Sequence, residues 1–183
     1  MGLNFGKGGL TALRWVLGST FTFSGVVKCV DPVGTAIFVE KYLATYSLEA
    51  LLPLSLTIAI ALSVMEFALG CLITDRVFSR VVSTITLSLV SLFTVVTLLS
   101  ATILPIGECG CFGNAIELTP WQTFFKNVVL LVMAFVVWRS ERGEELKINY
   151  LSLIFAVAVP LIINIYALRH LPIIDFMRGP KSS

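Results

Sequence analysis

The chain has 183 residues, of which 57% are hydrophobic and only 13% are charged, with a formal net charge of +2. A soluble domain usually carries about 25% charged residues, so this composition excludes a water-exposed surface and indicates an integral protein of the lipid bilayer. The small net charge argues against a nucleic-acid partner, and one His with four Cys predicts no metal centre.

Five segments are long and apolar enough to cross a bilayer, which requires about 20 helical residues. They cover residues 10–30, 51–72, 81–104, 120–138 and 150–168. Helices are expected because open strands would leave backbone groups unpaired in lipid. The predicted fold class is therefore all-α transmembrane, with a four-helix membrane bundle in residues 1–140. Residues 141–183 are expected to form a cytoplasmic connector, a fifth C-terminal hydrophobic helix and a short periplasmic tail.

Turn and cap residues predict where some of these helices begin and end. Asp31-Pro32 closes the first span, and residues 34–45 have the composition of a short amphipathic helix in the membrane interface. An ordinary connector is the alternative for this segment. Thr119 followed by Pro120 is typical of an N-cap and first helical residue, so the fourth span is expected to start there.

The basic residues predict which side of the membrane each connection faces. Positive charge favours the cytoplasm, and residues 105–119 contain no Lys or Arg. We therefore expect the N-terminus in the cytoplasm and 105–119 in the periplasm, with the protein in a bacterial inner membrane. Five spans would place the basic tail outside, which leaves a re-entrant fifth segment as an alternative. The basic residues of the two predicted cytoplasmic loops are Arg76, Arg80, Arg139, Arg142 and Lys147.

Cys109 and Cys111 are the candidate catalytic residues, a redox pair separated by Gly110. Disulfides can form and persist in the periplasm. A bridge closed over a single residue should be strained, and strained, exposed disulfides are the labile ones. The pair therefore favours thiol–disulfide exchange. A static disulfide, two reduced thiols, or a two-thiolate site for copper(I) or zinc are the alternatives.

Three further residues are expected near the same outer boundary. Cys29 is a candidate third thiol, although a buried Cys in a helix also serves as a small apolar filler. Lys28 and Lys126 are candidates for stabilising a neighbouring thiolate or attracting an anionic or quinone-like ligand. Snorkelling to the headgroups is the alternative for both lysines. No quinone site is recognisable in the sequence, so a quinone cofactor remains open.

Glu66 lies inside the second span, where an ionised carboxylate is costly and usually paired. Aligning the centres of the first two antiparallel spans puts Arg14 at a similar depth. The sequence therefore predicts a buried structural ion pair between Arg14 and Glu66, with proton handling by Glu66 as the alternative. Gly18 and Gly25, one heptad apart on the first span, predict a close helix–helix contact.

Three short motifs resemble a known family. They are Ser24-Gly25-x-x-Lys28, Glu66-x-x-x-Gly70 and Cys109-x-Cys111-Phe112-Gly113, and their order resembles the MauE branch of the DoxX-like membrane proteins over residues 10–140. The resemblance implies a four-helix transmembrane bundle similar in outline to disulfide-generating enzymes of the DsbB and vitamin-K-epoxide-reductase type. The DsbB-like enzymes use Cys-x-x-Cys pairs, whereas this chain has Cys-x-Cys.

The resemblance also implies a role in protein maturation. MauE-like proteins are implicated in maturing the disulfide-rich periplasmic enzyme methylamine dehydrogenase, together with a thioredoxin-like partner. We therefore expect a membrane thiol–disulfide oxidoreductase whose partners are a periplasmic thioredoxin-like protein and a disulfide-containing client. A non-catalytic membrane assembly subunit and a small proton-coupled transporter using Glu66 are the alternative functions.

Overall fold

The computed structural model describes residues 7–103, 119–141 and 149–170. These residues form helices and short connections, with no strand among them, which confirms the all-α fold class. The elements are α1 (Lys7–Val30), α2 (Pro32–Thr45), the short 3₁₀ helix η1 (Glu49–Leu54), α3 (Ser55–Asp75), α4 (Ser79–Thr102), α5 (Pro120–Ser140) and α6 (Tyr150–His170).

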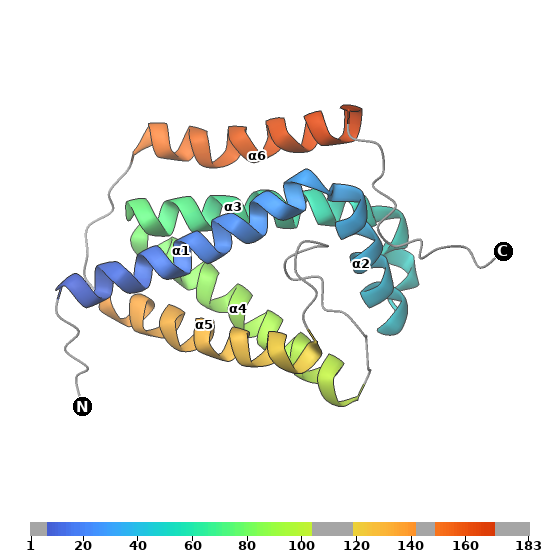
Figure 1. Ribbon diagram of the computed structural model, residues 1–183, viewed down its shortest axis with the longest axis horizontal. Helices are drawn as coiled ribbons and strands as arrows, with labels where there is room; N and C mark the ends of the chain where they lie inside the picture. The colour runs from blue at the N-terminus through green and yellow to red at the C-terminus, as the bar shows by residue number, and fades with distance from the viewer. Residues whose placement is uncertain (1–6, 104–118, 142–148, 171–183) are drawn as a thin grey trace.

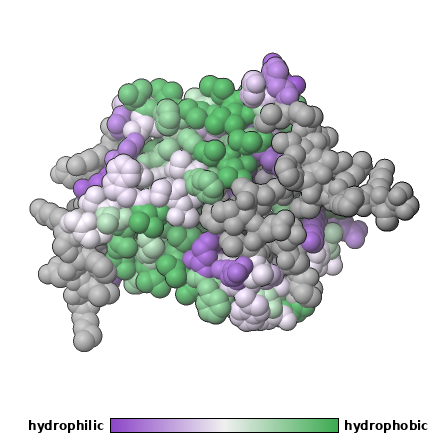
Figure 2. Space-filling view, in the orientation of Figure 1, coloured by the Kyte–Doolittle hydropathy of each residue, from purple (hydrophilic) through white to green (hydrophobic). Residues whose placement is uncertain are grey.

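The described helices have the length and the surface of membrane-spanning segments. Four stretches are apolar enough to cross a bilayer, namely η1 with α3, α4, α5 and α6, and the bent pair of α1 and α2 adds a fifth if it is one span. Hydrophobic residues cover large parts of the visible face (Figure 2). Soluble proteins rarely expose such surface, so the prediction of a multi-pass membrane protein is confirmed. Strongly exposed examples are Leu151, Ile154, Ile162, Phe125 and Val132.

Helices α1 and α3 form the centre of the bundle because glycines let their backbones approach. A Cβ atom at Gly25 would lie 2.5 Å from the backbone N of Phe67, and one at Gly18 would lie 2.8 Å from the carbonyl of Gly70. The close contact predicted at both glycines is confirmed. Helices α4 and α5 pack together on one side of this pair, and α6 lies along the other side (Figure 1).

Both predicted helix boundaries are confirmed, since α1 ends at Val30, just before Asp31-Pro32, and α5 begins at Pro120. The Asp31 side chain accepts a hydrogen bond from the backbone N of Gly34 at 2.8 Å, and α2 leaves α1 at an angle of 100°. Residues 34–45 are therefore helical. At the start of α5, Thr119 and Gln122 form a reciprocal capping box.

The bundle has two ends, which we name from the residues that lie there. At the Arg14 end, Arg14 of α1 meets Glu141, the C-cap residue of α5, and Ser152 near the start of α6 donates to Asp75 at the end of α3. The opposite, cavity end contains the last turn of α1, helix α2, the end of α4 and the start of α5. Alternate spans therefore run in opposite directions, as a helical membrane bundle requires.

Candidate functional site

A cavity of about 290 Å³ opens at the cavity end, between helices α1 to α5. Its wall is mostly apolar and carries five aromatic side chains. Three come from the segment that includes α2, because the sharp turn at Asp31 folds this helix over the mouth of the bundle. The cavity thus depends on α2, whose residues would lie elsewhere if α1 continued straight. The aromatic residues are Phe21, Phe38, Tyr42, Tyr46 and Phe93.

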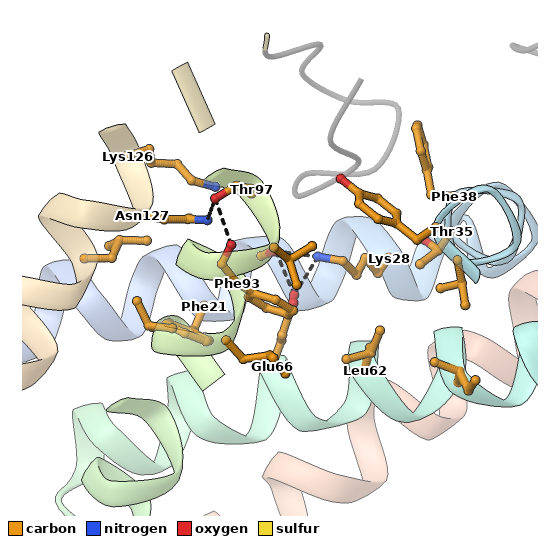
Figure 3. A pocket seen from close by; sticks show the side chains of 18 of the residues that line it. Phe21, Lys28, Thr35, Phe38, Leu62, Glu66, Phe93, Thr97, Lys126 and Asn127 are labelled. Atoms are coloured by element: carbon orange, nitrogen blue, oxygen red, sulfur yellow. Dashed lines mark hydrogen bonds and ion pairs between the residues drawn. The ribbon is translucent and has the colours of Figure 1, made fainter. Parts of the chain in front are cut away.

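A buried charged cluster forms one side of the cavity. The Lys28 Nζ donates to Glu66 Oε2 and to Ser24 Oγ at 2.7 Å each, and Ser24 Oγ donates to Glu66 Oε2 at 2.7 Å. The side chains of Lys28 and Glu66 are only 6% and 4% exposed, and Figure 3 shows them pointing toward one another. Such burial is tolerated because each charge is paired and hydrogen-bonded.

Local sequence explains how this cluster assembles. Ser24 and Lys28 are four residues apart and therefore share one face of α1. Gly25 lies between them and allows α3 to approach closely, so that Glu66 reaches both side chains. Because the Lys28 ammonium is matched by the Glu66 carboxylate, this side of the cavity has no net formal charge.

Helix α5 supplies the second polar side of the cavity. Asn127 Nδ2 donates to Thr97 Oγ1 of α4 at 3.4 Å, and Thr97 Oγ1 donates to the carbonyl of Phe93 at 2.8 Å. Lys126 extends from the same helix and also lines the cavity (Figure 3). Polar groups from α5 and from α1 therefore face one apolar space.

Tyr46 adds a further polar group to the wall. Its ring stacks on Tyr42, with ring centroids 6.5 Å apart. Its hydroxyl is buried and makes no hydrogen bond with any residue that the structure describes. A buried hydroxyl without a partner is costly, and other atoms of the Tyr46 side chain line the cavity.

Comparison with known families identifies the protein's relatives. The family described as methylamine utilisation protein MauE matches residues 7–139. The chain belongs to the MauE family. A curated relative, Protein TlpB of Flavobacterium psychrophilum, is 31% identical over 170 residues, and the match covers 85% of this chain and 43% of that protein. This chain thus spans less than half the length of that relative. No solved structure matches.

The first two of the three motifs that resemble MauE converge in the structure. Ser24, Lys28 and Glu66 form the charged cluster, while Gly25 and Gly70 allow the backbones of α1 and α3 to touch. The third motif is different, since Cys109 and Cys111 lie outside the described residues. The MauE match covers α1 to α4 and all but the end of α5, and does not include α6.

The predicted Arg14–Glu66 pair is wrong. Arg14 Nε instead contacts Glu141 Oε1 at 3.3 Å, and Glu66 is held by Lys28. The prediction aligned the centres of the two spans, whereas packing at the glycines sets a different register. Gly18 lies against Thr74, so Arg14, one turn earlier, is near the end of α3 and roughly two to three turns from Glu66.

Cys29 faces away from the cavity. Its side chain is fully buried, and Asn164 of α6 donates through Nδ2 to its Sγ at 3.2 Å and to Ser63 Oγ at 3.1 Å. The role of Cys29 as a third thiol stays a prediction. Exchange at this sulfur would require α6 to move away first.

Sequence reasoning missed several polar residues of the cavity, among them Asn127 and Tyr46. Asn127 carries a detectable signal, because an amide inside an apolar span usually faces the bundle interior. Tyr46 carries none, since it follows a short helix whose position depends on tertiary packing. Among the described residues, no group of His, Cys, Asp and Glu side chains could hold a metal ion.

Proposed function

We propose that this MauE-family protein handles disulfides of periplasmic proteins through thiol–disulfide exchange at Cys109 and Cys111. The observation that carries the proposal is the Gly-flanked Cys-Gly-Cys sequence between α4 and α5. Both flanking helices contribute residues to the cavity wall, Thr97 from α4 and Lys126 from α5. A redox pair in this connection would therefore be joined to the end of the bundle that also holds Lys28.

The proposed reaction is exchange with a thioredoxin-like partner. A thiolate of one protein attacks a disulfide sulfur of the other and releases the second sulfur as a thiolate, giving a mixed disulfide. A second attack resolves this intermediate, so one disulfide forms for each one broken. The partner would then pass the change to a disulfide-containing client.

The proposal includes a definite orientation and domain division. Residues 1–140 form the bundle with the N-terminus in the cytoplasm, and 141–183 add the connector, α6 and a periplasmic tail. The basic residues Arg76 and Arg80 support this sidedness, because they lie at the junction of α3 and α4, at the Arg14 end. The cavity end then faces the periplasm of the inner membrane.

The test combines trapping with a matched cysteine control. Cys111→Ser should trap a mixed disulfide between Cys109 and a periplasmic protein, detected as a reducible, higher-mass band in membranes quenched with an alkylating agent. The Cys109→Ser/Cys111→Ser variant should lose that band and leave client thiols unpaired. Cys71→Ser, which removes a half-buried thiol of α3, should change neither. Unchanged client disulfides in the double variant would refute the proposal and favour a non-catalytic assembly subunit.

A further inference from the structure

We propose that the cavity between helices α1 to α5 holds one acyl chain of an anionic phospholipid, whose head lies at Lys126. The proposal goes beyond thiol exchange and does not depend on it, because it uses only described residues of the bundle. Three observations lead to this ligand. The cavity reaches the face of the protein that contacts the bilayer, its apolar wall is elongated along the bundle, and its ionised side chains carry a net positive charge.

The cavity can be entered from the hydrocarbon of the membrane. Leu92 lies near the middle of α4 and lines the cavity, yet its side chain is 58% exposed. Ile58 and Leu62 of α3 are half-buried and line the same cavity. Both helices are candidate membrane spans, and they diverge from their short connection (Figure 1). The bilayer is therefore in contact with the cavity beside Leu92.

The apolar wall suits a chain that lies along the bundle. Ile58, Leu62 and Glu66 of α3 line the cavity at intervals of four residues, which together cover about 12 Å of that helix. On α4 the lining residues run from Val90 to Thr97, roughly 10 Å of helix. Empty apolar space loses dispersion contacts, and water requires polar partners that most of this wall lacks. An acyl chain fills the space without either cost.

The charge of the wall favours an anionic head. Among the described lining residues, Lys28 and Lys126 carry ammonium groups and Glu66 carries a carboxylate, so the formal charge is +1. Because the Glu66 carboxylate lies 2.7 Å from the Lys28 ammonium, the second ammonium determines the sign. Lys126 extends from α5, apart from that pair (Figure 3). A negative head at Lys126 is attracted there and avoids the carboxylate of Glu66.

Lys126 also lies at a depth that suits a phospholipid head. Trp121, Phe124 and Phe125 form an aromatic cluster in the first two turns of α5, and the Trp121 side chain is exposed. Exposed Trp residues are enriched at the level of the headgroups. Lys126 follows Trp121 by five residues, about 7.5 Å along the helix, and a Lys side chain can extend toward the interface. A phosphate can therefore meet the ammonium while one chain of the lipid enters the cavity.

Photocrosslinking of the full chain in nanodiscs would locate the bound chain. The probe is phosphatidylglycerol with a diazirine in the middle of one acyl chain, diluted into phosphatidylcholine, and peptide mass spectrometry identifies the labelled residues. We expect labels on Phe21 and Leu130, which are buried and line the cavity. Phosphatidylcholine with the same diazirine chain should label them about fivefold less, the value of one Lys near a membrane surface.

Matched variants separate the head of the lipid from its chain. Lys126→Gln should lower the labelling by phosphatidylglycerol to the level seen with phosphatidylcholine. Lys41→Gln, which removes the same charge from an exposed residue of α2 outside the cavity wall, should have no effect. Leu92→Trp adds bulk at an exposed position, where the bundle can still fold, and should lower the labelling of Leu130 by both lipids.

Three results would overturn the proposal. Labels confined to lipid-facing residues such as Val132, which is 60% exposed, would show that no chain enters the cavity. Equal labelling of Leu130 by the two phospholipids, or by phosphatidylglycerol in Lys126→Gln and wild type, would show that no anionic head is recognised. Stronger labelling of Leu130 by a diazirine fatty acid would assign the cavity to a free fatty acid.

Discussion

Two buried ion pairs among the described residues lie at opposite ends of the bundle, and they differ in surroundings. Lys28–Glu66 has a contact of 2.7 Å, is completed by Ser24 and faces a cavity. Arg14–Glu141 has a contact of 3.3 Å and joins α1 to the end of α5, and Arg14 Nη2 finds no hydrogen-bond partner among the described residues. Burial alone therefore does not identify a functional charge. The cavity-end pair is the better candidate for a functional charge because its compact network lies beside an aromatic cavity.

The largest expected effect is the loss of one partner at the cavity end. Glu66→Leu would leave the Lys28 ammonium buried without its carboxylate. Removing one partner of a buried ion pair typically lowers the free energy of unfolding by about 3–5 kcal/mol. Lys28→Met/Glu66→Leu removes both charges and should restore most of that stability. Equilibrium unfolding in mixed micelles measures both variants. Equal losses in the single and double variants would show that the charges themselves, and not their mutual compensation, stabilise the bundle.

The same experiment at the Arg14 end should give a smaller effect. Glu141→Leu removes a carboxylate at the C-cap of α5, whose contact with Arg14 is longer than that of the cavity-end pair. Helix ends open locally more readily than helix centres, which would let water reach Arg14. We expect a loss of about 1–3 kcal/mol, measured in the same micelles. A loss equal to that of Glu66→Leu would remove the distinction between the two pairs.

Gly25→Ala sharpens the comparison by testing how the cavity-end pair is assembled. The added methyl would lie 2.5 Å from the backbone N of Phe67, so α1 and α3 must separate, at a cost of about 1–3 kcal/mol. Gly8→Ala is the control, because nothing lies within 4 Å of its added Cβ. That substitution should be neutral or raise helix stability by up to about 1 kcal/mol. Similar behaviour of the two variants would contradict the close packing of α1 on α3.

The sequence could predict features that depend on neighbouring residues. The Thr119 cap, the helix after Asp31 and the close contacts at Gly18 and Gly25 follow from local chemistry or helical spacing, and the structure confirms all of them. Each can be inferred from residues that lie close together in the sequence. The same is true of the apolar spans, whose composition alone indicates a membrane environment.

Features that depend on register could not be predicted in the same way. Glu66 pairs with Lys28 and not with the predicted Arg14, because packing at the glycines sets a different register of α1 along α3. The cavity requires the 100° bend between α1 and α2, which brings Tyr46 into the wall of the same cavity as Asn127. Pairwise distances between helices are set by packing of the whole bundle, which a single sequence does not reveal.

The central claim is that Cys109 and Cys111 form an exchanging pair on the periplasmic side. The most direct measurement is labelling of reduced, intact cells with a membrane-impermeant maleimide, using Cys29→Ser/Cys71→Ser so that only this pair remains. The account predicts rapid labelling from outside, and protection of the pair when the cells are allowed to oxidise. Thiols that react only after the membrane is opened, or that never become protected, would contradict it.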